Sequence, residues 1–234
     1  MYCERTMRIV SYNIRKAVGL DGRRDPERVQ KVLMASKADV LVLQEADRRV
    51  PPRRSALPKT ILEAETPYRV ADVAVTDVSL GWHGNAVLVH RDLDIRATAR
   101  LPLPGLEPRG AIRVDIEGEF GTVTVIGAHL GLLRKWRRLQ MHALREHLET
   151  SERHRTLIAG DFNEWSVRSG FEPLGPDFDV IAPGRSFHAS YPVASLDRFA
   201  HGKGLRLTET GVIKDGAARH ASDHLPVWAK VAPA

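Results

Sequence analysis

Short apolar runs separated by turn-forming residues recur along the whole chain, and two longer stretches carry apolar residues at helical spacing. This pattern predicts an α/β protein. The longer stretches predict helices over 26–36 and 130–153, and a short helix is expected over 61–65. Loops are expected over 16–25, 48–58, 102–109 and 171–192. Strands are expected over 7–13, 40–43, 68–75, 86–90, 95–101, 110–117, 122–128, 157–159, 194–199 and 205–210, and residues 222–228 lead into a last strand.

The stretch 130–153 is the longest helical pattern. Its apolar stripe is expected to contain Leu133, Trp136, Gln140, Ala143, Leu144 and Leu148. Five cations on its other faces are Arg134, Lys135, Arg137, Arg138 and Arg145. Such a basic helix can be a solvated surface or a surface that binds phosphates or lipid.

Two β-α-β units can be recognised, one over 7–45 and one over 122–161. The first strand of each unit ends on a side chain that can ligate or hydrogen-bond, and the second ends on a carboxylate. Helices of such units cover the outside of a mixed sheet. If the two sheets stack on each other, these four polar strand ends (Asn13, Glu45, His129 and Asp161) meet at one rim.

Residues 156–163 carry the most informative of these strand ends. An apolar run ends at Gly160, and Asp161 and Asn163 follow two positions apart, so an extended backbone points both to one side. A carboxylate and an amide there can hold a metal ion, a water or a phosphate. The same residues are also common in simple turns, and the octapeptide by itself leaves both interpretations open.

Polar side chains at the ends of apolar runs form a larger set. It consists of Asn13, Glu45, His129, Asp161, Asn163, Asp197, Asp223 and His224, accompanied by the cation Arg109. Carboxylate oxygens without any thiol suit Mg²⁺ or Mn²⁺ better than Zn²⁺. Arg109 suits a phosphoryl oxygen. The set therefore predicts a metal-assisted phosphate site.

Composition narrows the setting of this chemistry. With 43% hydrophobic and 27% charged residues the 234-residue chain is typical of a globular protein, and Cys3 as its one cysteine excludes an intrachain disulfide. The first ten residues lack the apolar core of a signal peptide, and no apolar run is long enough to span a membrane, which predicts a cytoplasmic protein. The net charge of +6 favours anionic partners, although an Arg-rich composition has the same effect.

Eight motifs together resemble the endonuclease/exonuclease/phosphatase superfamily. They are SYNIR (11–15), LQE (43–45), GNAVLV (84–89), PRGA (108–111), GAHL (127–130), AGDFN (159–163), SLDRF (195–199) and SDHLPV (222–227). The resemblance implies a DNase I-like four-layer α/β/β/α sandwich with two central mixed sheets. It also implies one domain over 1–234, with residues 1–6 flexible, and a monomer.

The resemblance also implies a role for each site residue. Glu45 resembles the principal metal ligand, assisted by Asn13 and Asp223. Asp161 resembles the residue that orients or deprotonates the attacking water, and Asn163 resembles a phosphoryl-oxygen ligand. His224 resembles the histidine beside the scissile phosphate, Asp197 the carboxylate that fixes its tautomer, and His129 and Arg109 further phosphate contacts. Whether Asp161 or His224 is the base, and whether one or two ions act, stays open at this point.

The implied activity is Mg²⁺- or Mn²⁺-dependent hydrolysis of a phosphodiester by in-line attack of water, on nucleic acid or on a phospholipid headgroup. A peripheral contact with an anionic membrane is compatible with the charge. One alternative is a phosphomonoesterase acting on a small phosphorylated metabolite or an inositol phosphate. The other is a binding protein that kept the fold without catalysis.

Overall fold

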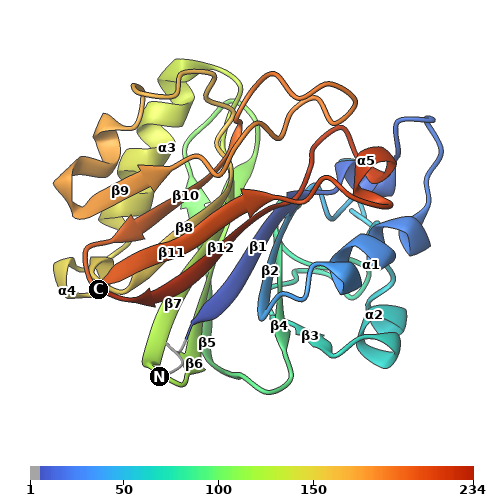
Figure 1. Ribbon diagram of the computed structural model, residues 1–234, viewed down its shortest axis with the longest axis horizontal. Coiled ribbons are helices and arrows are strands. Elements are labelled where there is room, and N and C mark those ends of the chain that lie inside the picture. The colour runs from blue at the N-terminus through green and yellow to red at the C-terminus, as the bar shows by residue number, and fades with distance from the viewer. Residues whose placement is uncertain (1–5) are drawn as a thin grey trace.

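Two six-stranded sheets lie face to face in the computed structural model, which describes residues 6–234 (Figure 1). The expected flexibility of residues 1–6 falls, except for Thr6, outside the described residues. The first sheet has the order β11 (Leu205–Val212), β12 (Val227–Pro233), β1 (Met7–Asn13), β2 (Val40–Gln44), β4 (Ala86–His90), β3 (Tyr68–Val70). The second has the order β5 (Asp94–Leu103), β6 (Arg109–Gly118), β7 (Gly121–His129), β8 (Thr156–Asp161), β10 (Asp197–Gly202), β9 (Phe178–Ile181).

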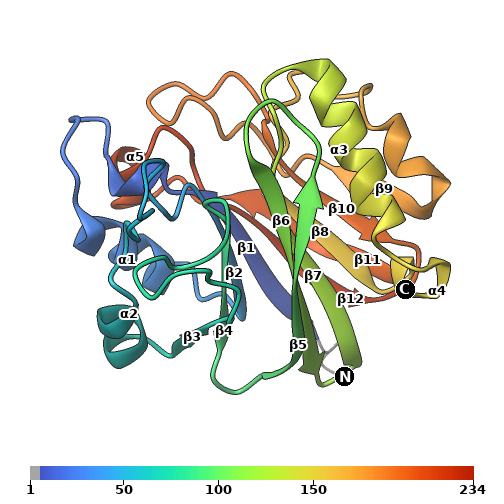
Figure 2. The same cartoon turned by 180° about the vertical axis from the view of Figure 1, so that it is seen from behind.

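Helices cover the outer face of each sheet (Figure 2). The first sheet is covered by η1 (Arg15–Ala17), α1 (Pro26–Ala35), α2 (Lys59–Glu65) and α5 (Ala218–Ala221). The second is covered by α3 (Arg134–Glu146) and η2 (Glu172–Asp177), and the short α4 (Thr150–Arg153), which buries no residue, precedes β8. The four-layer sandwich that the resemblance implied is therefore confirmed.

The inner faces of the two sheets share an apolar core that fixes their spacing. Val42 and Val87 of the first sheet pack against Ile112 of the second. Gly127 of β7 lies between them, and a Cβ added there would sit 2.9 Å from Val42 Cγ1 and 3.3 Å from Ile112 Cγ1. The absence of a side chain at this position lets the sheets approach closely near the ends of β1 and β7.

Both predicted β-α-β units are present, and each joins a pair of parallel strands. In the first unit Asn13 of β1 is in register with Gln44 of β2, one residue before Glu45. In the second, His129 of β7 is in register with Asp161 of β8. Because parallel strands end at the same edge of a sheet, each unit delivers its polar strand ends together.

Three expectations about secondary structure are wrong. The predicted helix 130–153 is divided into α3 and α4, because the side chains of Glu149 and Glu152 form a capping box that starts a new helix. The predicted strand 68–75 ends at Val70. In the segment that follows, the carbonyls of Val73 and Ala74 accept hydrogen bonds from the Arg100 guanidinium instead of from a neighbouring strand. The predicted loop 171–192 contains η2 and β9.

The predicted stripe of α3 also needs correction. Leu133, expected to be buried, is 61% exposed, whereas Arg137, expected on an outer face, is buried. Arg137 Nη2 donates to Glu164 Oε2 over 2.8 Å, and its guanidinium also donates to the carbonyl of Leu132. A buried guanidinium is compatible with this packing because a carboxylate and a carbonyl replace its water.

No helix among residues 6–234 is long and apolar enough to cross a membrane.

The neighbours Arg137 and Arg138 provide a matched test of this packing. Replacing Arg137 by Ala leaves the buried Glu164 carboxylate unpaired, so we expect the free energy of unfolding to fall by about 3 kcal/mol. Arg138→Ala removes a solvent-exposed pair with Glu172 and should change it by less than about 0.5 kcal/mol. Denaturant unfolding of both variants measures the difference, and equal losses would contradict the buried pair.

Candidate active site

The buried carboxylate of Asp161 lies at the centre of the site. Asp161 ends β8 and is 1% exposed. Its Oδ2 accepts a hydrogen bond from Asn13 Nδ2 at 3.1 Å, across the junction of the two sheets. The same oxygen lies 3.5 Å from His129 Nε2 and 3.6 Å from His224 Nε2. Three predicted site residues from three other segments of the chain thus converge on one oxygen atom of Asp161.

Strand register places the second carboxylate beside the first. Asp197 begins β10 directly opposite Asp161 in an antiparallel pair. Its Oδ2 lies 2.8 Å from His224 Nδ1 and also accepts a 2.5 Å hydrogen bond from Ser186 Oγ. The expected Asp–His pair is therefore formed. His224 comes from the loop that precedes β12, so the pair joins the two sheets.

The pKa values of the two histidines are shifted in opposite directions. Burial would lower the pKa of His224, but the nearby carboxylates of Asp197, Asp161 and Asp223 outweigh it and raise that pKa to about 9. Burial lowers the pKa of His129 to about 3, with Asp161 opposing and the cation of Arg109 assisting. Near pH 7 the Asp161 carboxylate therefore faces a neutral imidazole and an imidazolium.

Asn163 is held tightly beside Asp161. Its backbone N–H donates to Asp161 Oδ1 at 2.9 Å, and its side-chain amide donates to the carbonyl of Leu130 at 2.8 Å. The residue adopts a left-handed conformation with φ of 51°, which asparagine tolerates better than most residues. This local turn accounts for an asparagine after AGDF and orients both oxygens of Asp161.

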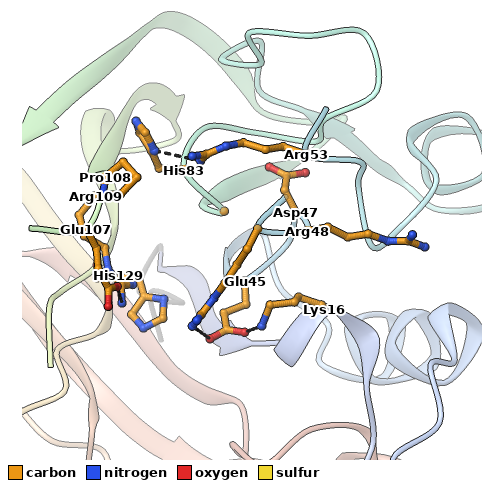
Figure 3. Close-up of a pocket in the computed structure, with 12 residues that line it drawn as sticks. Lys16, Glu45, Asp47, Arg48, Arg53, His83, Glu107, Pro108, Arg109 and His129 are labelled. Atoms are coloured by element: carbon orange, nitrogen blue, oxygen red, sulfur yellow. Dashed lines mark hydrogen bonds and ion pairs between the residues drawn. The ribbon is translucent and has the colours of Figure 1, made fainter. Parts of the chain in front are cut away.

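A cavity of about 350 Å³ opens beside this cluster (Figure 3). Glu45, Arg109 and His129 line it, so these three predicted site residues share one hollow. Glu45 forms ion pairs with Lys16 and, at 3.9 Å, with Arg49.

Arg109 and Asp223 complete the predicted set. Arg109 pairs with Glu107 at 2.9 Å and points its other terminal nitrogen at the carbonyl of His129. Asp223 lies 3.4 Å from Arg15 and is linked to Asn13 through Ser222, whose hydroxyl donates to the Asn13 carbonyl. All nine predicted residues thus belong to one contiguous region.

The atom types of the predicted metal ligands suit a hard divalent cation. Glu45, Asn13 and Asp223 offer carboxylate and amide oxygens, and the Glu45 carboxylate already attracts cationic side chains. Asp161, Asp197 and His224 also place possible ligand atoms within 4.8 Å of one another. In that second group, His224 Nδ1 and Asp197 Oδ2 lie 2.8 Å apart and already bind each other.

Several residues that shape the site escaped the sequence interpretation. Asp47 accepts hydrogen bonds from the backbone N–H groups of Leu80 and Gly81, which ties the loop before β4 to the end of β2. Arg198, in the SLDRF motif, is fully buried and donates to the carbonyls of Glu164 and Ser166. An arginine next to a site aspartate was the available signal, but its burial depends on loop packing.

Gly110 and Trp82 explain part of the PRGA motif. A Cβ on Gly110 would lie 2.2 Å from the Trp82 ring, so this ring requires a glycine beside Arg109. Asn85 adds a hydrogen bond from its side-chain amide to the Gly110 carbonyl at 2.8 Å. These contacts fix the start of β6, and with it the position of Arg109.

Solved structures share this architecture. The catalytic domain of human nocturnin with bound sulfate matches with a TM-score of 0.73 at 17% identity, over 99% of this chain and 97% of that one. A mannosyl-6-phosphatase from Bacteroides thetaiotaomicron matches with a TM-score of 0.74 at 18% identity, over 96% of this chain and 99% of that one. An endonuclease/exonuclease/phosphatase from Beutenbergia cavernae matches with a TM-score of 0.73 at 22% identity, over 98% of this chain and 72% of that one. At these identities the likeness concerns the fold.

Sequence comparison assigns the family. No curated protein matches the chain significantly. A family model described as the endonuclease/exonuclease/phosphatase family matches residues 10–224, which contain every residue of the site described above. Together with the two-sheet sandwich, this match means that the chain belongs to the endonuclease/exonuclease/phosphatase family.

Proposed function

We propose that this protein is a Mg²⁺- or Mn²⁺-dependent phosphoesterase that hydrolyses a phosphodiester by in-line attack of water. The observation that carries the proposal is the convergence of Asn13, His129 and His224 on one buried oxygen of Asp161, next to a cationic cavity. Phosphate-ester hydrolysis needs an oriented water and compensation of negative charge, and this arrangement offers both.

Glu45, Asn13 and Asp223 would hold the ion. When bound, a divalent ion neutralises charge on the phosphoryl oxygens and on the leaving oxygen. Lys16 shares the Glu45 carboxylate and would give way to the ion, since a lysine side chain is flexible.

Because His224 is protonated near pH 7, we assign the role of general base, which orients and deprotonates the attacking water, to Asp161. His224, with a pKa of about 9, holds its proton near pH 7 and is suited to donate a hydrogen bond to a phosphoryl oxygen from Nε2. The Asn163 backbone N–H holds Asp161 Oδ1 and the Asn13 amide holds Oδ2, so the carboxylate is fixed in one orientation, from which it can orient a water and accept its proton. Asp197 keeps the imidazolium in place, and Arg109 supplies a further cation.

A specific feature supports the phospholipid alternative over nucleic acid. An apolar groove of about 170 Å³ adjoins the cationic cavity and shares Glu107 and Arg109 with it. Leu106 and Leu132, which line this groove, are 80% and 67% exposed, and Leu133 is 61% exposed. Exposed leucines at the mouth of a phosphate site are typical of contact with lipid.

Cations of α3 continue this surface. Arg134, Lys135 and Arg138 are exposed immediately after the leucines. This arrangement supports a phospholipid headgroup as substrate and an anionic membrane as partner. The monomer and the cytoplasmic location stay predictions.

Activity on a simple diester tests the proposal. We expect wild-type protein to hydrolyse bis-p-nitrophenyl phosphate with Mg²⁺ or Mn²⁺ and to lose this activity in EDTA. Asp161→Asn and Glu45→Gln should each lower kcat by about 100- to 1,000-fold. Asp179→Asn, in an exposed pair with Lys203, is the control that should leave kcat unchanged.

The substrate p-nitrophenyl phosphate separates the alternatives. Faster hydrolysis of this monoester than of the diester would favour the phosphomonoesterase. If folded protein hydrolyses neither ester with any divalent ion, the chain is a binding protein and the proposal is wrong.

Asp197→Asn tests the charge state of His224. Without the Asp197 carboxylate, burial is opposed only by Asp161 and Asp223, so the pKa of His224 should fall clearly from about 9. The stability that this pair contributes is present below about pH 6.5 and is lost as the pH rises through about 9. An NMR titration of histidine ring protons, assigned with His224→Gln, gives the pKa directly. An unchanged pKa in Asp197→Asn would contradict the assignment.

A Leu132→Ser/Leu133→Ser double variant tests the lipid surface. Removing two exposed leucines should weaken binding to vesicles of phosphatidylcholine and phosphatidylglycerol by about tenfold or more. Val75→Ser, at 61% exposure in the loop before β4, is the matched control and should bind as wild type does. Cleavage of plasmid DNA by protein that does not sediment with vesicles would favour nucleic acid instead.

A further inference from the structure

The wall of the cavity opposite His129 contains a paired arginine and histidine (Figure 3). Arg53 Nη1 lies 3.1 Å from His83 Nδ1. We infer that the Arg53–His83 pair binds a second phosphate of the substrate, separate from the ester that is cleaved. This inference rests on the proposed function and adds the requirement that the substrate carries two phosphates.

Hydrogen-bond donors of the pair remain available to an anion. A guanidinium always donates, so His83 Nδ1 must accept from Arg53, which places the imidazole proton on Nε2. Burial and the neighbouring Arg53 charge lower the pKa of His83, which keeps the ring neutral. Arg53 uses one of its five N–H groups in this contact, so guanidinium and imidazole together can donate to several phosphate oxygens.

Charge balance in the cavity leaves Arg53 without a carboxylate of its own. Glu45 is paired with Lys16 and Arg49, and Glu107 is paired with Arg109. The Asp47 carboxylate accepts from two backbone N–H groups and feels the Arg53 charge at longer range, but no carboxylate within residues 6–234 lies within ion-pair distance of Arg53. The cavity thus keeps positive charge that an anionic group can compensate.

Backbone strain is concentrated around the same cavity. Eight residues other than glycine have positive φ within the described chain, and four of them line the cavity. These four are Lys16, Glu45, Arg53 and His83, with φ between 50° and 56°. A left-handed conformation is unfavourable for such residues, and this strain is typically retained at ligand sites. Both members of the pair share it with Glu45.

The segments that carry the pair are tied to the end of β2. Ala46 N–H donates to the Gly84 carbonyl, next to His83, and Arg48 N–H donates to the Arg54 carbonyl, next to Arg53. These bonds fix the pair relative to Glu45, the proposed metal ligand. A fixed spacing between a metal ligand and a cation selects substrates whose two phosphates match it. The cavity volume of about 350 Å³ is in the range that accommodates small molecules.

Calorimetry in EDTA tests the pair without requiring catalysis. We expect wild-type protein to bind glucose 1,6-bisphosphate about tenfold more tightly than glucose 1-phosphate. Arg53→Gln should reduce this preference to less than about threefold, because it removes the charged donor. Arg53→Lys keeps the charge and should recover part of the preference. Arg54→Gln is the matched control, because Arg54 is adjacent but lines a different hollow, and it should retain the full preference.

A second comparison identifies the source of the second phosphate. The dinucleotides pTpT and TpT differ by one terminal phosphate, as the two sugar phosphates do. A preference for pTpT that exceeds the preference for the bisphosphate would place the second phosphate in a nucleic acid, and the reverse would place it in a phosphorylated headgroup or a small sugar phosphate.

The inference is overturned if wild-type protein binds glucose 1,6-bisphosphate no more tightly than glucose 1-phosphate, and pTpT no more tightly than TpT. It is also overturned if folded Arg53→Gln keeps the full preference for the ligand with two phosphates. Failure of the proposed function gives a different result, which is absence of metal-dependent hydrolysis of bis-p-nitrophenyl phosphate.

Discussion

One buried carboxylate oxygen connects the two halves of the molecule. Asp161 Oδ2 accepts from Asn13 of the other sheet and lies against His129 and His224. An isolated carboxylate in this position would be costly, so the polar neighbours are a condition for the fold as much as for the chemistry. The sheets must therefore be spaced so that β1 and β8 end together, and Gly127 in the shared core permits that spacing.

The two histidines beside this oxygen differ in protonation. Asp197 keeps His224 protonated, while burial keeps His129 neutral, although both rings face the same carboxylate. The Asp161 carboxylate therefore has one cationic and one neutral imidazole beside the same oxygen. Register determines the difference, because Asp197 is opposite Asp161 in the sheet and can reach His224.

Loops with left-handed residues surround the Asp161 cluster and the cationic cavity beside it. Buried Asp47 binds the backbone of the loop before β4, and buried Arg198 binds the carbonyls of the loop after β8. The left-handed conformations of Glu45 and Asn163 persist because such contacts hold them. The exposed leucines of the neighbouring groove form a different kind of surface. They line the same groove as Arg109, which places an apolar region directly beside the cationic cavity.

The sequence by itself determined the layers, the two β-α-β units and nearly all strands, because alternation of apolar residues is a local property. It also brought Asp161 and its partners together as motifs of one family. Only the tertiary structure decided that Arg137 is buried, that Arg53 meets His83, and that Leu132 is exposed beside the site. These outcomes depend on contacts between residues far apart in the chain, such as the 148 positions between Asn13 and Asp161. Local pattern carries no information on such contacts, since sheet packing and loop closure determine them.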